Sequence, residues 1–372
     1  MPDADLAFTR YFAALPDPRV NRTKKHTLHD ILGVTFCAVI CGANSFEEIE
    51  RFGEARQEWL KRFFTLENGI PSHDTFNRVL AALDHDVFAA CFARWMAELG
   101  TAVGLRTIAI DGKACRSAPA DTFSGCLHLV NAWATQNNLF LGSVAVADGS
   151  NEIAALPALL KVLDLNGALV SLDAAFCQTE ILAQIRQQSG DYVVTVKGNQ
   201  PTLHQAVVAA FERAGETGFA DCVMASSTED GHGRHEERYV TVLKNPEGLP
   251  EGWTDVRAAV MVGRERAVAG KNTSSAHFYL TSLRYGAKKL ANYIRGHWGV
   301  ENGLHWCLDV AFGEDNNRTR DTNAGANLGV VRRVALSLLK QDPTRGSIKA
   351  KRLNAAWDDK YLQRVLQGFK AN

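Results

Sequence analysis

Several features that would assign a chain to a common class are missing from these 372 residues. The net charge is zero, with 41 Lys plus Arg against 41 Asp plus Glu, so bulk charge favours neither a nucleic acid nor a membrane as partner. The most apolar run, residues 31–43, is shorter than the roughly 18 residues that a membrane span requires. The polar start MPDADLAFTR has no signal-peptide pattern. We therefore expect a cytoplasmic protein without a membrane partner, whose charged contacts are local.

Signatures of zinc and nucleotide binding are missing as well. The eight cysteines are scattered in apolar contexts, with no C-x-x-C pair and no paired zinc-ligand spacing. We expect them to be reduced and buried. The glycines near residues 142, 149 and 198 form no G-x-G-x-x-G or Walker pattern, so the sequence does not support a phosphate-cradling loop.

Helical patterns fill the first hundred residues. A buried helix is predicted from Leu28 to Cys41, and Ser45 with Glu48 matches the capping box that precedes a helix. A further helix is expected over residues 86–99. Short helices joined by tight turns fit either a helix-turn-helix DNA reader or a small helical bundle, and the spacing leaves both interpretations open.

The pattern changes to strands after Thr107. Three β-type runs (RTIAIDG, LHLVNAWA, LFLGSVAVAD) precede a helix at 152–163, and the strand ALVSLDA, a second helix and the strand DYVVTVKG follow. Three antiparallel strands followed by helix, strand, helix and strand are typical of a ribonuclease H-like α/β fold. Further β-type runs between residues 221 and 283 indicate a β-rich insertion, and the chain is helical again from Asn292.

These patterns predict four regions. They are an N-terminal helical domain that is a candidate DNA reader, a ribonuclease H-like catalytic core, a β-rich insertion subdomain, and a basic helical C-terminal tail. Their expected bounds are residues 1–100 for the first, 101–201 with 286–330 for the core, 202–285 for the insertion and 331–372 for the tail.

Two aspartates follow hydrophobic strands that should be neighbours. Asp111 ends the strand IAID and Asp173 ends the strand LVSLD, while Glu301 lies on a later helix. Three carboxylates from two strand ends and a helix suit Mg²⁺, which takes oxygen ligands and leaves positions for water and phosphate. An aspartate at a strand end is often only a turn or helix cap, but two of them on matched strands favour a metal site.

The helix around Glu301 carries other side chains that could take part in chemistry. His297 and His305 lie four residues before and after the glutamate, on one helical face. The histidines either flank the metal site, where they contact substrate or tune Glu301, or belong to a zinc site. No H-E-x-x-H pattern or thiolate supports zinc. We expect Trp298 and Trp306 to pack against the core.

Basic residues are concentrated at the end of the chain. Residues 315–372 contain 12 Lys and Arg against five Asp, including Arg332 and Arg333. Such a tail can neutralise DNA phosphates, although a solvated helical face is the usual explanation for a charge cluster. Four other candidate DNA contacts lie at strand ends or turns, in segments whose glycines are equally well explained by turn stabilisation: Lys197, Asn199, His232 and Arg234.

Seven segments together resemble one family. They are IPSHDTFNRVL, IAIDGKACR, LHLVNAWA, SNEIAALPALLKVLDLNGALVSLDA, GDYVVTVKGNQ, GHGRHEER and RGHWGVENGLHWCLDVAFGEDNNRTR. Spread over nearly the whole chain, they are similar to the H-repeat-associated (Rhs-linked) DDE transposases of bacterial insertion sequences. The resemblance implies that Asp111, Asp173 and Glu301 form an Asp-Asp-Glu triad that binds Mg²⁺, with Mn²⁺ as a substitute.

The same resemblance implies double-stranded DNA as the partner. Such a transposase binds terminal inverted repeats, cleaves there and joins the freed ends to target DNA, as a homodimer on DNA. The DNA contacts expected from the residues and the resemblance together are Lys113, Arg116, Lys197, Asn199, Arg234, Arg295, His297, His305, Arg318 and Arg320.

Two local departures and two alternatives accompany this interpretation. The segment DGKACR differs from the DGKTLRG that is usual in the family, although Lys113 and Arg116 are in place. Related transposases place Tyr and Arg seven and four residues before the glutamate and Lys seven after it, whereas these positions hold Ile294, His297 and Leu308. The alternatives are a retired transposase that acts as a non-catalytic DNA-binding protein, and a metal-dependent nuclease without strand transfer.

Overall fold

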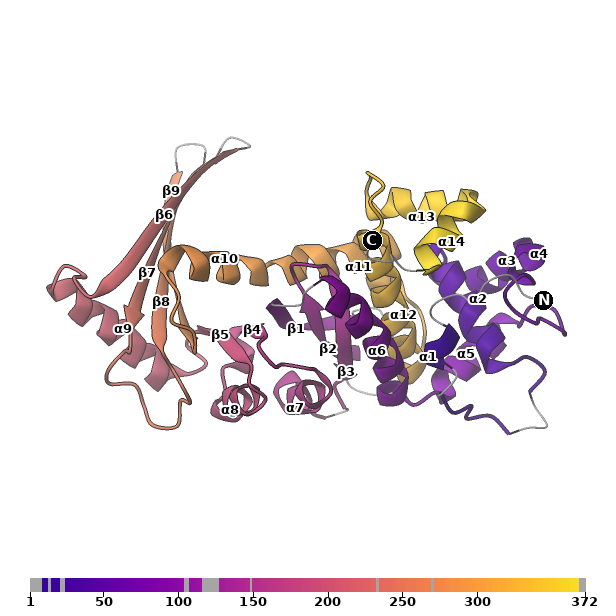
Figure 1. Cartoon of the computed structure of the whole chain (residues 1–372), viewed down its shortest axis with the longest axis horizontal. Coiled ribbons are helices and arrows are strands. Elements are labelled where there is room, and N and C mark those ends of the chain that lie inside the picture. The colour runs from indigo at the N-terminus through magenta and orange to yellow at the C-terminus, as the bar shows by residue number, and fades with distance from the viewer. Residues whose placement is uncertain are drawn as a thin grey trace. The chain divides into compact units, whose positions relative to one another are not determined.

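The computed structural model describes residues 9–12, 15–20, 24–103, 107–115, 127–147, 149–231, 234–268 and 271–367. They form a mixed α/β fold with a large mixed sheet (Figure 1), which confirms the predicted class. The chain divides into two compact units, which are described separately. Unit 1 contains Met1–Leu105, Gly112–Val162 and Val300–Asn372, and unit 2 contains Arg106–Asp111 and Leu163–Gly299.

The N-terminal part of unit 1 is helical, as predicted. Its helices are α1 (Thr9–Phe12), α2 (Leu28–Ile40), α3 (Phe46–Ala55), α4 (Gln57–Leu60), α5 (His73–Ala82) and α6 (His85–Val103). Half of the expected capping box forms at α3, because Ser45 Oγ accepts from the Glu48 N–H at 3.2 Å. Glu48 instead accepts from the Asn44 N–H.

The C-terminal part of unit 1 is also helical, but its central helix is buried. The elements are η3 (Glu301–His305), α11 (Trp306–Phe312), η4 (Glu314–Asn316), α12 (Thr322–Gln341), α13 (Ile348–Trp357) and α14 (Asp359–Gln367). Arg332 and Arg333 on α12 are 1% and 0% exposed, and Arg333 donates to the carboxylate of Glu314 and the amide oxygen of Asn131. The prediction that these two arginines neutralise DNA phosphates is therefore wrong, because their charges are used inside the protein.

Three strands and one helix complete unit 1. The strand β1 (Thr107–Cys115), which belongs to this unit from Gly112 on, is a neighbour of β2 (Leu127–Ala134), and β2 pairs antiparallel with β3 (Leu139–Ala145). The strand order in this unit is β3-β2-β1. The helix α7 (Glu152–Val162) follows, as the sequence predicts.

Unit 2 contains the other end of the sheet. Its elements are the first half of β1, β4 (Leu169–Leu172), η2 (Ala174–Phe176), α8 (Thr179–Gln187), β5 (Asp191–Val196), α9 (Pro201–Glu216), β6 (Cys222–Gly231), β7 (Arg234–Lys244), β8 (Ala258–Val268), β9 (Lys271–Thr281) and α10 (Ala287–His297). The strand order is β1-β4-β5-β9-β8-β7-β6. The strands of the predicted β-rich insertion extend this sheet, since β9 pairs antiparallel with β5.

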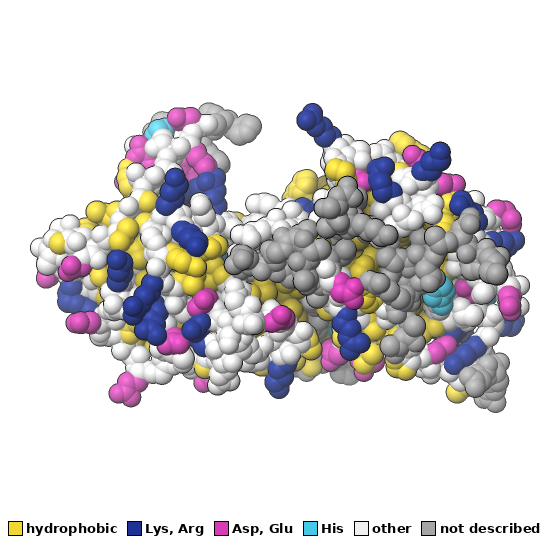
Figure 2. Space-filling model, in the orientation of Figure 1, with side chains coloured by type: hydrophobic (Ala, Val, Ile, Leu, Met, Phe, Trp, Pro, Cys, Tyr) yellow, Lys and Arg dark blue, Asp and Glu magenta, His cyan; other side chains and the backbone are white. Residues whose placement is uncertain are grey.

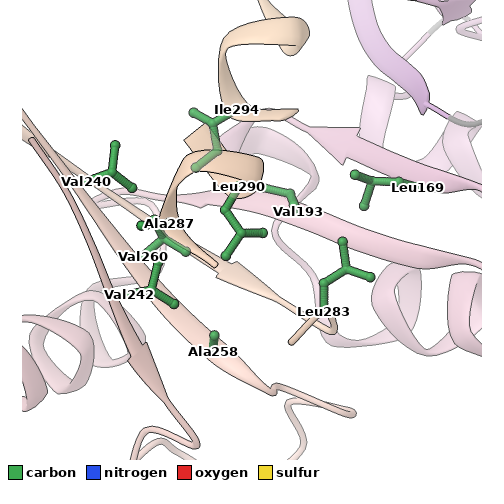
Figure 3. Packing of buried hydrophobic residues seen from close by; sticks show 10 residues of the cluster. All are labelled: Leu169, Val193, Val240, Val242, Ala258, Val260, Leu283, Ala287, Leu290 and Ile294. Atoms are coloured by element: carbon green, nitrogen blue, oxygen red, sulfur yellow. The ribbon is translucent and has the colours of Figure 1, made fainter. Parts of the chain in front are cut away.

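Helix α10 packs against the sheet of unit 2 through apolar side chains. Figure 3 shows its residues Ala287, Leu290 and Ile294 beside side chains of the strands, in a buried cluster that includes Leu169 and Val193. Leu290 is fully buried. The packing therefore fixes the helix that directly precedes the segment of Glu301.

The described residues test the expectations about cysteines and about membrane-spanning helices. The six cysteines whose side chains are described carry free thiols, as predicted, and four of them are buried, whereas Cys41 and Cys222 are half-buried. Burial raises the pKa of Cys41 to about 12, which keeps that thiol protonated at neutral pH. Within the described ranges, no helix is both long and apolar enough to cross a membrane.

Candidate active site

Asp111 and Asp173 occupy equivalent positions in two neighbouring strands. The parallel pairing of β1 with β4 runs from Thr107 opposite Leu169 to Ile110 opposite Leu172. Each aspartate directly follows the last of these paired residues in its own segment. Adjacent strands lie about 4.8 Å apart, and paired positions project to the same face of a sheet. The pairing thus brings the two carboxylate-bearing positions side by side within unit 2.

The strand ends differ from the prediction at one of these residues. β4 stops before Asp173, but β1 continues beyond Asp111 to Cys115, so Asp111 marks the end of the pairing rather than the end of its strand. Asp173 is the N-cap residue of η2, yet its side chain makes no capping hydrogen bond. Helix capping therefore does not account for the carboxylate of Asp173.

The segment after β5 contacts Asp173 and η2. Lys197 Nζ lies 3.2 Å from Asp173 Oδ1, and both side chains are about half exposed. The Asn199 side-chain amide donates to the carbonyl of Ala174 at 2.8 Å. Lys197 thus places a positive charge next to the candidate metal ligand, while Asn199 holds the loop in position.

His297 contacts the strand that precedes Asp173. Its Nδ1 lies 3.0 Å from the hydroxyl oxygen of Ser171 on β4, two residues before the aspartate. Burial lowers the pKa of His297, while the negative charge of Asp173 opposes that shift. The ring therefore connects α10 to β4 within unit 2.

Glu301 opens a π-helical turn in unit 1. The turn spans Glu301–His305, and the Trp306 N–H donates to the carbonyl of Glu301. Single π turns inside helices occur frequently at functional sites. Glu301 is exposed. The prediction that both tryptophans pack in the core is wrong, because Trp298 and Trp306 are 56% and 60% exposed.

Lys113 is buried in an ion-pair cluster of unit 1. Its side chain is 7% exposed, and Nζ lies 2.7 Å from Asp309 Oδ1 and 3.5 Å from Asp315 Oδ1. Burial alone would lower the pKa of Lys113, but the carboxylates of Asp309, Glu314 and Asp315 raise it. The ammonium is therefore charged and engaged by the protein itself.

Comparison with known proteins places this chain in a family. The model described as "Transposase DDE domain" matches residues 78–338, and the model described as "DDE_Tnp_1-associated" matches residues 9–96. The chain belongs to the transposase DDE domain family. This membership confirms the resemblance that the sequence motifs indicated.

Two named relatives align over most of this transposase-family chain, and a third aligns over a short part of it. "Putative transposase YncI" of Escherichia coli O157:H7 is 36% identical over 364 residues, which cover 96% of this chain and 93% of the relative. "H repeat-associated putative transposase YhhI" of Escherichia coli K12 is 35% identical over 367 residues, with 96% and 97% covered. "Inactive transposase YbfQ" of the same strain is 46% identical over 71 residues, which cover 19% of this chain and 84% of that protein.

The remaining predicted DNA contacts of this transposase-family chain differ in their surroundings. Arg318 and Arg320 are exposed, and His305 is half-buried. Arg295 is exposed and forms an ion pair with Glu229. Arg116 and His232 lie outside the described residues, as does the side chain of Arg234. On the face drawn in Figure 2, basic and acidic side chains are interspersed, in keeping with the zero net charge.

One carboxylate close to β1 was not singled out from the sequence. Glu152, the first residue of α7, has Oε1 3.3 Å from His128 Nδ1. A Cβ atom added at Gly112 would lie 2.2 Å from the same oxygen. Glycine at position 112 therefore allows this carboxylate to approach the backbone of β1 closely. A glycine inside a strand is the sequence signal for such a close approach.

The candidate ligands are compatible with a hard divalent ion in their chemistry. Asp111 and Asp173 offer carboxylate oxygens, which Mg²⁺ and Mn²⁺ prefer over the nitrogen and sulfur ligands of structural zinc. Among the described residues, no group of three or more His, Cys, Asp or Glu side chains is arranged to hold a metal ion. Asp111 and Asp173 belong to unit 2, and Glu301 belongs to unit 1.

Proposed function

We propose that this chain is the DDE transposase of an insertion sequence. It binds the terminal inverted repeats of its element, cleaves the DNA there and transfers the freed strand to target DNA. Asp111, Asp173 and Glu301 are the catalytic carboxylates. The observation that carries this proposal is the equivalent position of the two aspartates on adjacent parallel strands, in a chain that belongs to the transposase DDE domain family.

The strand arrangement supports a ribonuclease H-like catalytic core. Strands β1 to β5 follow the order β3-β2-β1-β4-β5. The pair β2–β3 is antiparallel, and the pairs β1–β4 and β4–β5 are parallel. This is the arrangement expected when an antiparallel meander is followed by helix, strand, helix and strand.

Oxygen ligands at these positions suit Mg²⁺, with Mn²⁺ as a substitute. Divalent ions bound there would activate the attacking oxygen and stabilise the leaving oxygen of a phosphodiester. Asp111 and Asp173 supply charge from two rigid strands. Lys197 neutralises part of the charge of Asp173 and lies where it can contact a phosphate.

Exposed basic residues bind the double-stranded DNA. Arg318 and Arg320 follow α11 and η4 on the surface of unit 1, and Lys197 and Arg295 belong to unit 2. Contacts from such side chains to phosphates set affinity without reading sequence. Because two ends must be joined to one target, the chain acts as a homodimer on DNA.

Isosteric replacement of each carboxylate tests the function. Asp111→Asn, Asp173→Asn and Glu301→Gln should each reduce cleavage of a duplex carrying the inverted repeats that flank the gene by at least about 100-fold, since each removes a metal ligand. Binding to that duplex should stay within about twofold, because phosphate contacts supply most of the affinity. Asp221→Asn, at an exposed aspartate next to β6, is the matched control.

The wild-type reaction separates the proposal from its alternatives. Cleavage followed by joining to a second duplex supports the transposase. Cleavage without joining would support a nuclease, and binding without cleavage at any Mg²⁺ or Mn²⁺ concentration would support a retired transposase.

A further inference from the structure

Lys113 connects the strand of Asp111 to the helical segment of Glu301. Side chains two residues apart in a strand lie on the same face, so Lys113 projects from β1 on the side of Asp111. Its ammonium contacts Asp309 on α11 at 2.7 Å. Asp309 lies eight residues after Glu301, and residues 299–312 are helical throughout, with the π turn in the middle.

We propose that the Lys113–Asp309 ion pair is a positioning device for the catalytic glutamate. It holds α11, and with it the π turn that begins at Glu301, on the strand that carries Asp111. This inference rests on the proposed function, in which Asp111 and Glu301 belong to one triad. Lys113 is therefore a positioning residue rather than a DNA contact.

The burial of Lys113 supports this role over a DNA contact. A lysine that is 7% exposed needs partners for its charge, and here Asp309 and Asp315 provide them. Contact with a phosphate would require the side chain to leave this cluster. That move would leave two neighbouring carboxylates without their shared cation, at a large cost in free energy.

Apolar packing holds α11 in the fold independently of the ion pair. Leu308 and Phe312 are fully buried and Cys307 is 5% exposed. Apolar contacts alone leave the rotation of a helix about its axis adjustable. The Lys113–Asp309 ion pair fixes the rotation of α11, because its hydrogen bond is directional. Loss of the pair should displace Glu301 without unfolding the protein.

Metal-directed backbone cleavage tests the position of Glu301 directly. With Fe²⁺ in place of Mg²⁺, ascorbate and peroxide generate hydroxyl radicals that cut the chain near the bound ion. The wild-type chain should be cut near residues 111, 173 and 301. In Lys113→Met, cutting near 301 should fall at least fivefold relative to cutting near 111, and the double variant Lys113→Asp with Asp309→Lys should restore it.

The matched control is another buried lysine of unit 1. Lys351 is also 7% exposed, and its ammonium donates to the carbonyls of Leu339 and Asp342. Lys351→Met should lower the melting temperature without changing the cutting pattern. If Lys113→Met does not fold, Asp309→Ala removes the helix partner while Asp315 still faces the ammonium, and this variant must show the same selective loss near 301.

A kinetic measurement separates positioning from DNA contact. Lys113→Met should lower kcat for cleavage about tenfold and raise the Mg²⁺ concentration for half-maximal rate, with the Kd for DNA unchanged. A folded Lys113→Met protein with wild-type cutting near 301, or one whose only defect is a raised Kd for DNA, would overturn the inference and leave the triad intact. Failure of the wild-type chain to be cut near 301 would overturn the proposed triad, and this inference with it.

Discussion

Asp173 and Lys197 form an ion pair at the ends of neighbouring parallel strands, with Oδ1 and Nζ 3.2 Å apart. Asp173 directly follows the last residue of β4 and Lys197 directly follows the last residue of β5, and these strands pair in parallel with Leu172 opposite Val194. A divalent ion bound by Asp173 has to share the carboxylate with this ammonium. In the proposed site, Lys197 and the metal would therefore compete electrostatically, and binding of the metal would release Lys197 to contact a phosphate.

Removing that competition should strengthen metal binding. In Lys197→Met we expect Mn²⁺ to bind about fivefold more tightly, because the interaction between charges about 4 Å apart near the surface amounts to roughly 1 kcal/mol. Binding of DNA should weaken in the same variant. Mn²⁺ titration followed by electron paramagnetic resonance measures the first effect. Lys288→Met, at an exposed lysine of α10, is the control, and weaker Mn²⁺ binding in Lys197→Met would contradict the competition.

The sequence was sufficient to predict the aspartate pair, because strand identity and register follow local rules. The runs IAID and LVSLD are continuous and apolar, as strands buried on both faces are. Once both were assigned to adjacent parallel strands, the two carboxylates had to emerge together. The extension of β1 to Cys115 was missed, since its polar residues Gly112 and Lys113 pack against groups distant in sequence.

Local sequence patterns could not predict which charged and aromatic residues of the C-terminal region are buried. Arg333 is buried because Glu314 and Asn131 surround its guanidinium, and neither partner is close enough in sequence to be recognised. Trp306 is exposed, although we expected it to pack against the core. The π turn at Glu301–His305 adds a residue to one turn and shifts the faces that follow.

Gly112 should tolerate alanine only when Glu152 is also changed. The new Cβ would lie 2.2 Å from Glu152 Oε1, so Gly112→Ala must displace the carboxylate from His128 and should cost about 1–2 kcal/mol of unfolding free energy. Glu152→Ala in the same chain should recover most of that loss, which urea unfolding measures as a coupling of about 1 kcal/mol.

The control for this strand position is Gly263→Ala in β8. A Cβ there meets its nearest neighbour, the Tyr239 Cβ, at 3.8 Å, which is ordinary contact. Its unfolding free energy should change by less than about 0.5 kcal/mol. Strictly additive effects of Gly112→Ala and Glu152→Ala would show that the two residues do not interact.

Two classes of arginine should respond in opposite ways to removal of charge. Arg333→Met removes the buried guanidinium that donates to Glu314 and Asn131, so the free energy of unfolding should fall by about 3–5 kcal/mol. Arg318→Met should leave stability within about 0.5 kcal/mol, and should reduce the salt dependence of DNA binding by roughly one phosphate contact. Urea unfolding measures the stability of both variants, and DNA binding over a series of salt concentrations measures the salt dependence. An unchanged salt dependence in Arg318→Met would remove that residue from the DNA surface.

Acid sensitivity of unit 1 should depend on His85. The side chain is 8% exposed, and Nδ1 lies 3.0 Å from Asn327 Oδ1. Burial lowers the pKa of His85, while the hydrogen bond to Asn327 opposes the shift. Below pH 6.5 the unfolded chain therefore takes up a proton at this residue before the folded chain does. The stability contribution is complete above pH 6.5 and is lost as pH falls towards the folded pKa.

Urea unfolding of wild type and His85→Gln at pH 8, 6.5 and 5.5 should reveal this proton. The wild type should lose more unfolding free energy than the variant between pH 6.5 and 5.5, by at most about 1.4 kcal/mol, the limit for one proton over one pH unit. His73→Gln is the control, because the Glu50 hydrogen bond raises the pKa of that exposed histidine. His73 therefore loses its contribution as pH rises, and its removal should not reduce the acid sensitivity. An identical pH dependence in wild type and His85→Gln would show that His85 is protonated equally readily in both states.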